Sequence, residues 1–322
     1  MNSRFIILFV LSGLVCVASA RTLPSRILGM YVLLADDTVP GYTSNDTWQP
    51  YLQPTITMGS NTVFFTFINP TTMSVPPAFT KLAKTRGASG TRSIPSTTTI
   101  LFSIGGESYS NSPNPWPFLT SAAAARDMAA QVATWPSVHG CDGIDFDIES
   151  GAGDNSAAGA NALVFFQTLR TLNPTMIITQ PVFGYPQVAS QIYVVNNGWT
   201  KNGTWLGGAN AVGIMVYTGS QALQYVKNYD NATHQWQGFP IQVNVPSGSV
   251  FVGACGCGST SDIMTMVDAC LEQQLGGIMV WYSSAMDAAT DKPAIQYSGG
   301  SSDAAFSSVG SGWSTALSKL NS

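Results

Sequence analysis

The chain has 322 residues, of which 45% are hydrophobic and only 9% are charged, and its formal net charge at pH 7 is −4. A weakly acidic chain without a basic cluster makes nucleic acid and anionic membranes poor candidates as partners, so we expect neither. Its 8 tryptophans and 11 tyrosines suit a neutral ligand that is rich in hydroxyl groups. The length allows one large α/β barrel or two smaller domains.

Residues 1–20 have the pattern of a secretory leader. Arg4 precedes an apolar stretch over residues 5–17, and Ala-Ser-Ala at 18–20 has the small-x-small form of a cleavage site. No later segment reaches the roughly 18 apolar residues that a membrane span needs. We therefore predict a signal peptide over 1–20 and a secreted, extracellular domain over 21–322, with a retained N-terminal anchor as the alternative. Glycosylation sequons that agree with secretion begin at Asn45, Asn202 and Asn231.

Apolar runs of strand length recur along the chain, with helix-length stretches between them. Most are continuously apolar and rich in Val, Ile and Phe, as in a parallel sheet that is buried on both faces. The predicted strands cover residues 27–34, 62–69, 98–106, 143–149, 176–183, 211–218, 241–247 and 277–283.

Helices are predicted between several of these strands. They cover residues 118–135, 157–172, 261–277 and, near the end of the chain, 313–320. The third begins with a Ser-Asp capping signal, and Gly276 can close it. Alternating strands and helices predict a (β/α)8 TIM barrel, and a doubly wound open sheet is the alternative. Since no linker, repeat or added module is visible, a single domain is the simplest reading.

The fourth predicted strand carries a row of acidic side chains. Asp145, Asp147 and Glu149 alternate with apolar residues, so they share one face of the strand. In a barrel this face would line the interior, and Glu149 would lie at the C-terminal rim, where barrel active sites are built. The alternative is a half-exposed strand with a solvated face, which the buried character of the neighbouring strands opposes.

Electrostatics limits how this row can ionise. Neighbours in the row are roughly 6.6 Å apart along the strand, and at an effective dielectric of about 20 two full charges repel by about 2.5 kcal/mol, or near two pKa units. We expect Asp145 and Asp147 to titrate as a coupled pair with at least one raised pKa. The pair should also help to keep Glu149 protonated, as a general acid requires.

The motifs of this chain resemble those of glycoside hydrolase family 18, the chitinases and related enzymes. Asp142-Gly143-Ile-Asp145-Phe-Asp147-Ile-Glu149 is similar to the family's DGxDxDxE signature. The other matching motifs are Ser103-Ile-Gly105-Gly106 for its SxGG, Met215-Val-Tyr217 for its MxY, and Trp281 for its eighth-strand tryptophan.

This resemblance implies a retaining, substrate-assisted mechanism, in which no carboxylate of the enzyme attacks the sugar. Glu149 would protonate the glycosidic oxygen while the 2-acetamido carbonyl of the sugar attacks the anomeric carbon. Asp147 would orient the acetamido group, Asp145 would share a proton with Asp147, and Tyr217 would donate a hydrogen bond to the attacking carbonyl. No metal or organic cofactor is implied.

The other residues of the motifs have a structural interpretation beside the functional one. Ser103, Gly105 and Gly106 fit an ordinary strand-to-loop turn, whose glycines would let the backbone pass close to the acidic row. Asp142, followed by Gly143, falls on the other face of the strand, so we expect it to form structural hydrogen bonds near the strand start.

Several residues are candidates for binding the sugar. Trp281 is expected to form a stacking floor for the pyranose, with a core position as the alternative. Tyr31 and Phe67 could line the mouth of the barrel or fill its core. Gln180 could contact sugar hydroxyls, and Met215 belongs to the same expected binding set.

The chain departs from the family pattern at one position. Many relatives carry Asp or Asn after the sixth-strand tyrosine, where this chain has Thr218. The region at 248–276 is also too short for the extra α+β insertion of some members, which implies an open groove that suits endo-acting cleavage. The cysteines predict a bridge from Cys255 or Cys257 to Cys270, whereas a CxC metal site is the rival reading.

The predicted function is a chitinase that hydrolyses β-1,4-N-acetylglucosamine linkages, with chitin or N-acetylglucosamine oligosaccharides as partners and a monomeric state. An endo-β-N-acetylglucosaminidase acting on N-glycans shares the catalytic row and remains an alternative. The other alternative is a non-catalytic chitin-binding lectin, which Thr218 favours. A Ser-His-Asp hydrolase is disfavoured, because neither His139 nor His234 flanks a nucleophile motif.

Overall fold

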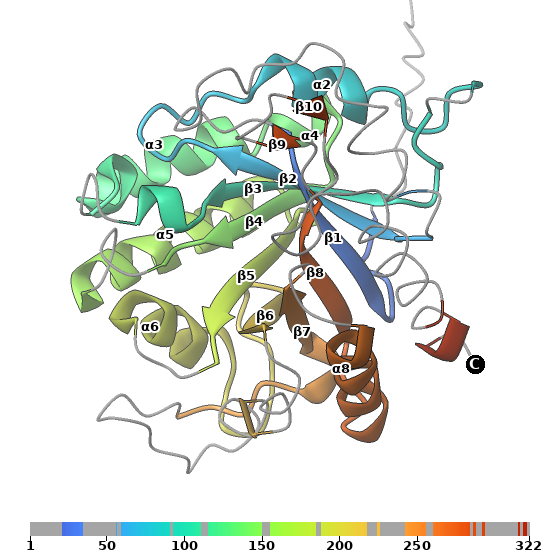
Figure 1. The fold of residues 1–322 in the computed structure, drawn as a ribbon. Helices are drawn as coiled ribbons and strands as arrows, with labels where there is room; N and C mark the ends of the chain where they lie inside the picture. Colours follow the sequence, from blue (N-terminus) through green and yellow to red (C-terminus); the bar gives the residue numbers. More distant parts are fainter. Residues whose placement is uncertain are drawn as a thin grey trace, which may run out of the picture.

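Eight parallel strands close into a barrel in chain order (Figure 1). This confirms the predicted (β/α)8 barrel. The computed structural model describes residues 21–34, 56, 59–90, 93–110, 115–149, 155–184, 188–217, 224–225, 242–255, 260–283, 286–287, 292–293, 315 and 318–320. The barrel strands are β1 (Ile27–Leu33), β2 (Thr62–Ile68), β3 (Thr99–Gly105), β4 (Gly143–Asp147), β5 (Ile177–Phe183), β6 (Ala211–Tyr217), β7 (Val250–Cys255) and β8 (Gly277–Ser283).

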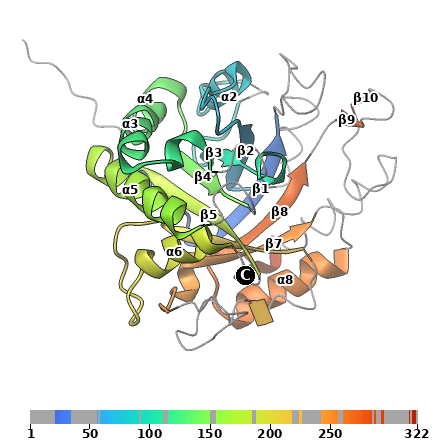
Figure 2. The same cartoon turned by 90° about the vertical axis from the view of Figure 1, so that its left-hand side faces the viewer.

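Helices surround the barrel, and α3, α5 and α6 lie side by side along one flank in both views (Figures 1 and 2). The α-helices are α2 (Pro77–Ala83), α3 (Ala122–Val132), α4 (Trp135–His139), α5 (Ser156–Leu172), α6 (Ala189–Gly198) and α8 (Thr260–Glu272). Short 3-10 turns are η2 (Glu107–Tyr109), η3 (Pro117–Leu119) and η5 (Ser247–Ser249), and β9 (Met286–Asp287) pairs antiparallel with β10 (Lys292–Pro293). Over the described segments, no helix combines the length and apolar character needed to cross a membrane.

The strands separate two apolar cores. The outer core lies between the strands and the helices, and Phe146 of β4 packs there against Phe165 and Phe166 of α5, with ring centroids 5.8 and 5.0 Å away. The inner core fills the barrel, where Tyr31 stacks on Phe64 at 4.3 Å. Burying each such side chain stabilises the fold by about 1.5–3 kcal/mol. Successive side chains of a strand point alternately into the inner core and the outer core.

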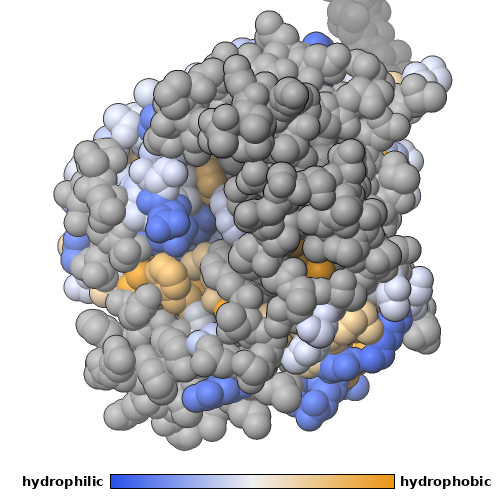
Figure 3. Space-filling view, viewed as in Figure 1, coloured by the Kyte–Doolittle hydropathy of each residue, from blue (hydrophilic) through white to orange (hydrophobic). Residues whose placement is uncertain are grey.

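Helix α8 has one face exposed to solvent and one face buried against the barrel. Ser261, Thr265 and Asp268 are exposed, whereas Ile263 and Val267 are buried against the barrel. This spacing is that of an amphipathic helix. Figure 3 shows hydrophilic side chains over the place that α8 has in Figure 1.

The seventh strand differs from the prediction. It is formed by Val250–Cys255 rather than by residues 241–247. Val243 and Val245 are buried, as in a strand of the core, but the described chain there is irregular and leads into η5. Pro246 precedes η5 and has no N–H to donate to a strand ladder. The apolar residues of this run therefore belong to a buried loop.

Two helix predictions are also corrected. The predicted helix 118–135 is divided into η3, α3 and α4, and Pro136 lies in the first turn of α4, where a missing N–H is tolerated. The predicted closure of α8 at Gly276 is wrong, because α8 ends at Glu272 and Gln274 takes the left-handed conformation (φ 53°). Helices α2 and α6 were not predicted.

The predicted disulfide from Cys255 or Cys257 to Cys270 is wrong. Cys270 is buried with a free thiol, which donates to the carbonyl of Leu275 at 3.7 Å. The reason is geometric, because α8 runs back along the barrel and carries Cys270 about 15 Å from the helix start at about 1.5 Å per residue. Cys255 lies at the opposite end of the barrel, and Cys257 is outside the described residues.

Candidate active site

Asp145 is the best-connected member of the acidic row. Its side chain is fully buried inside the barrel and accepts hydrogen bonds from the hydroxyls of Tyr31 (2.9 Å), Ser103 (2.8 Å) and Thr179 (2.6 Å). The strand register aligns Ser103, Asp145 and Thr179 on β3, β4 and β5. Burial raises the pKa of Asp145 to about 6, although the three hydroxyl donors oppose this shift.

Asp147 lies next to Asp145 in the row, towards the C-terminal mouth of the barrel. Its side chain is 5% exposed, and Oδ1 has no hydrogen-bond partner among the described residues. Burial raises the pKa of Asp147 well above its usual range, and the carboxylates of Glu149 and Asp145 raise it further. A buried carboxyl oxygen without a partner is rare in a folded protein, and such an oxygen is available to a ligand donor.

Glu149 follows the end of β4 by two residues and is partly exposed at the rim. Burial raises its pKa to about 7, and the carboxylate of Glu107 contributes in the same direction. Glu149 can therefore hold its proton at a pH where an ordinary glutamate is ionised. The sequence predicted that the aspartate pair would raise this pKa, whereas the neighbouring carboxylate that raises the pKa of Glu149 is that of Glu107.

Two glycines at the end of β3 allow the backbone to approach the acidic row. Gly105 and Gly106 have φ values of 104° and 86°, a region that disfavours other residues. The Gly106 N–H donates to the carbonyl of Asp147 at 2.9 Å, and a Cβ on Gly105 would lie 2.2 Å from that oxygen. A Cβ on Gly143 would lie 1.8 Å from the carbonyl oxygen of Ile177. The backbone at Asp147 and at Ile177 can therefore lie this close to its neighbours only if residues 105 and 143 are glycines.

Aromatic side chains lie beside the row. Trp281 of β8 is partly exposed, and its ring centroid is 5.7 Å from that of Tyr31 and 5.3 Å from that of Phe67. Tyr31 and Phe67 are buried, at 2% and 6% exposure, so they support Trp281 and contribute little surface of their own. Met215 is buried in the inner core. The side chain of Tyr217, the last residue of β6, lies outside the described part, as does Thr218.

Gln180 does not have the place that the sequence predicted. It is fully buried and shares the outward face of β5 with Ile178 and Val182, which belong to the outer core. The neighbouring Thr179 takes the inward face and contacts Asp145. A contact between Gln180 and a sugar in the mouth does not fit this face of the strand. Both polar atoms of its amide lack a partner in the described structure.

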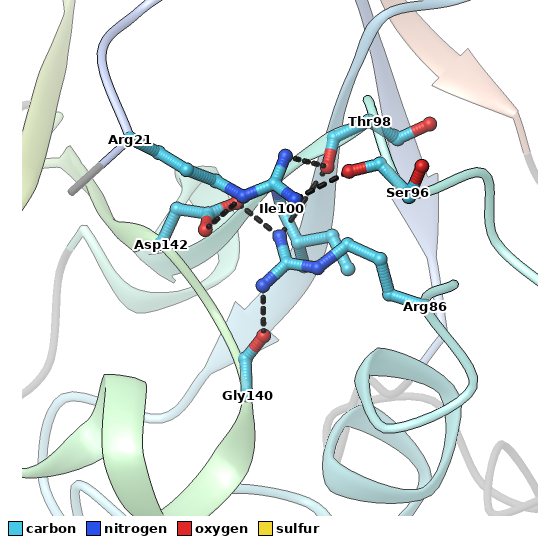
Figure 4. A network of polar contacts seen from close by, with 7 residues as sticks. All are labelled: Arg21, Arg86, Ser96, Thr98, Ile100, Gly140 and Asp142. Carbon is cyan, nitrogen blue, oxygen red and sulfur yellow. Dashed lines mark hydrogen bonds and ion pairs between the residues drawn. The ribbon is translucent and has the colours of Figure 1, made fainter. Parts of the chain in front are cut away.

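Asp142 lies at the opposite end of β4 and ties the N-terminal side of the barrel together (Figure 4). It accepts a hydrogen bond from the Ile100 N–H at 2.8 Å, pairs with Arg86, and lies 3.3 Å from the Arg21 guanidinium. Arg86 also donates to the carbonyl of Gly140 at 3.0 Å. These contacts are the structural hydrogen bonds expected for Asp142.

Sequence reasoning missed two residues of the site. Thr179 belongs to an apolar strand and could be found only once its register with Asp145 was known. Glu107 follows directly after the glycine pair at the end of β3, and an acid at that point of a barrel strand is a usable signal. Within the described residues, no group of three or more His, Cys, Asp or Glu side chains could hold a metal ion.

The comparison with models of protein families finds no match, and neither does the comparison with curated proteins. Solved structures do match. Active domain 2 of the thermostable chitinase from Pyrococcus furiosus, a catalytic-site mutant complexed with chito-oligosaccharides, is 13% identical with a TM-score of 0.61, and the match covers 92% of this chain and 97% of that one.

Two plant structures are similar over nearly the same length. The GH18 chitinase from Cycas revoluta in complex with allosamidin is 12% identical with a TM-score of 0.54, and the match covers 90% of this chain and 99% of that one. A chitinase-like agglutinin from Robinia pseudoacacia is 13% identical with a TM-score of 0.55, with the same coverage of both chains. At such identities the likeness shows that the chain has the barrel fold of these proteins, and the function has to be argued from the site.

Proposed function

We propose that this chain is a glycoside hydrolase of the family 18 type, a secreted chitinase that hydrolyses β-1,4-N-acetylglucosamine linkages within chitin or its oligosaccharides. The observation that carries the proposal is the acidic row. Asp145 and Asp147 are buried side by side, and Glu149 lies at the mouth with a pKa raised to about 7. The shared barrel fold supports it, because two chitinases with this fold have been solved in complex with chito-oligosaccharides and with allosamidin.

The chemistry follows from the state of each carboxyl. Protonated Glu149 gives its proton to the glycosidic oxygen as the bond from that oxygen to the anomeric carbon breaks. The 2-acetamido carbonyl of the same sugar forms a new bond to that carbon, which retains the configuration after the second step. Ionised Glu149 then removes a proton from water, and the water oxygen replaces the acetamido oxygen at the anomeric carbon.

Asp147 and Asp145 would stabilise the positive charge that develops on the acetamido nitrogen. Oδ1 of Asp147, which has no partner among the described residues, can accept the N–H of the acetamido group. Asp145 is fixed by three hydroxyl donors and would share a proton with Asp147. Tyr217, at the end of β6, would donate to the acetamido carbonyl.

The partly exposed ring of Trp281 would stack on the apolar face of the pyranose. Helix α8 takes up most of the chain between β7 and β8. No insertion of domain size fits there, which favours binding of a long chain across the mouth and cleavage within it.

A second candidate is a non-catalytic chitin-binding lectin. The agglutinin from Robinia pseudoacacia favours it, since a protein named as a lectin shares this barrel. Thr218 favours it too, because the expected Asp or Asn is absent from a position beside the catalytic tyrosine. The intact acidic row favours the chitinase over the lectin.

The test compares wild type with Glu149→Gln on chitotetraose and on a chromogenic chitobioside. We expect turnover by wild type, a loss of at least about 10²–10⁴-fold in the variant, and unchanged binding of chitotetraose by calorimetry. Binding without turnover by wild type would establish the lectin. Cleavage of N-glycans from a glycoprotein, with none of chitotetraose, would establish the endo-β-N-acetylglucosaminidase.

A further inference from the structure

We infer that Gln191 is a positioning residue, whose side-chain amide takes the place of a missing backbone hydrogen bond between β4 and β5 and so fixes the peptide that carries Glu149. Gln191 lies on α6 and is 2% exposed. Its Nε2 donates to the carbonyl of Ile148 at 2.6 Å, and its Oε1 accepts the N–H of Phe183 at 3.2 Å. The inference rests on the proposed function only in giving Glu149 a catalytic role.

The backbone ladder between β4 and β5 ends early, which creates the gap. Its pairs run from Gly143 with Ile177 to Asp145 with Thr179, whereas β5 continues to Phe183. A primary amide has one donor side and one acceptor side, as a peptide group has. The Gln191 amide can therefore bond to both strands where they no longer bond to each other.

The contact with Ile148 bears directly on Glu149. The carbonyl of Ile148 and the N–H of Glu149 belong to one planar peptide group, so fixing that oxygen limits how the Cα of Glu149 can move. On the other flank, the Gly106 N–H holds the carbonyl of Asp147 at 2.9 Å. The end of β4 is thus held from β3 by backbone and from α6 by a side chain.

Helix α6 is itself held close to α5. A Cβ on Gly159 of α5 would lie 2.7 Å from Cβ of Tyr193 and 3.0 Å from Cα of Ser190, so only glycine allows this approach. Gln191 therefore projects from a packed helix, and its amide is buried with both hydrogen bonds made. Buried amides with good partners are ordered, which is what a positioning role requires.

Gln191→Met keeps the length of the side chain and removes both hydrogen bonds. Because a misplacement of 1 Å can reduce turnover about 10²-fold, we expect kcat on the chromogenic chitobioside to fall about 10- to 100-fold. KM should stay within about twofold, since the Gln191 amide bonds to the backbone of Ile148 and Phe183 and not to a side chain proposed to bind the sugar. The matched control is Gln167→Met on the exposed face of α5, which should leave both constants unchanged.

Gln191→Glu, assayed over the pH range in which the variant is folded, makes the contact with Ile148 depend on pH. The carboxyl keeps an acceptor for Phe183 and can donate to Ile148 only while it is protonated. The deficit in kcat relative to wild type at the same pH should therefore be small in acid and grow as the pH rises. A deficit that is the same at every pH would mean that the Ile148 contact does not matter for turnover.

Hydrogen exchange at the Phe183 amide tests the contact without any turnover. We expect this amide to exchange faster in Gln191→Met than in wild type. A wild-type exchange rate, or a wild-type kcat in a folded Gln191→Met, would overturn the inference while leaving the proposed function intact. Absence of turnover by wild type would instead overturn the proposed function and, with it, any effect of Gln191 on turnover. The exchange rate alone would then decide whether Gln191 fixes the backbone.

Discussion

Replacing Glu149 by Gln should make the protein more stable at alkaline pH while it lowers turnover by at least about 10²-fold. The pKa of Glu149 is raised to about 7 by burial and by Glu107, from 4.5 for an ordinary glutamate. At pH 8 the folded wild type must hold an ionised carboxylate in a place that disfavours the charge. The side-chain amide of the variant cannot ionise, so this cost disappears.

The magnitude follows from the difference between the two pKa values. A shift of about 2.5 units corresponds to about 3 kcal/mol at 1.36 kcal/mol per unit. The folded state binds the proton more tightly than the unfolded state, so the stability of wild type falls as the pH rises from about 4.5 to about 7 and levels off above that. With an unfolding entropy of roughly 2.1 cal/mol/K per residue over about 300 residues, 3 kcal/mol raises Tm by about 5 °C.

The assay is urea unfolding of wild type and Glu149→Gln at pH 4 and pH 8, followed by fluorescence of the tryptophans. We expect equal free energies of unfolding at pH 4 and a gain of about 3 kcal/mol for the variant at pH 8. Glu272→Gln, at the exposed end of α8, is the control and should differ from wild type by no more than about 0.5 kcal/mol. A variant as stable as wild type at both pH values would refute the burial argument for Glu149.

Other predictions concern neighbouring groups. Glu107→Gln should lower the pKa of Glu149, so the alkaline limb of the kcat profile should move to lower pH; an unmoved limb would mean that the Glu107 carboxylate does not act on Glu149. Asp142→Asn leaves Arg86 without its buried partner and should cost about 3–5 kcal/mol in urea unfolding; a loss under about 1 kcal/mol would contradict this. Gln180→Met removes a buried amide without hydrogen-bond partners and should raise the free energy of unfolding by about 1–3 kcal/mol, whereas a decrease would reveal a partner such as bound water.

The periodicity of the sequence was sufficient for most of the barrel. Seven of the eight predicted strands overlap the observed ones, because a strand buried on both faces needs a continuous apolar run. The run at 241–247 shows the limit of this signal. Val243 and Val245 are as buried as strand residues, but burial alone does not distinguish a strand from a packed loop. Pro246 was the local evidence against a strand.

The acidic row was predictable because side chains alternate strictly along a strand. The contacts that complete the site depend on how neighbouring elements are placed. Thr179 reaches Asp145 through strand register, and Gln191 reaches Ile148 from a helix that the sequence did not predict. Cys270 shows the same limit. It is close to Cys255 in sequence, but α8 carries it to the other end of the barrel. Spacing within one element can be read from a sequence, whereas contacts between elements require the fold.

The two ends of β4 put acidic side chains into opposite electrostatic conditions. At the N-terminal end, Asp142 is paired with two arginines and hydrogen-bonded to backbone, so its charge stabilises the barrel. At the C-terminal end, Asp147 and Glu149 form no ion pair with any described residue, and burial raises the pKa of both. Changes at the two ends should therefore have opposite signs, with Asp142→Asn destabilising and Glu149→Gln stabilising at pH 8. A protein with few charges can keep a destabilising row at this candidate active site because the same strand is anchored firmly at its other end.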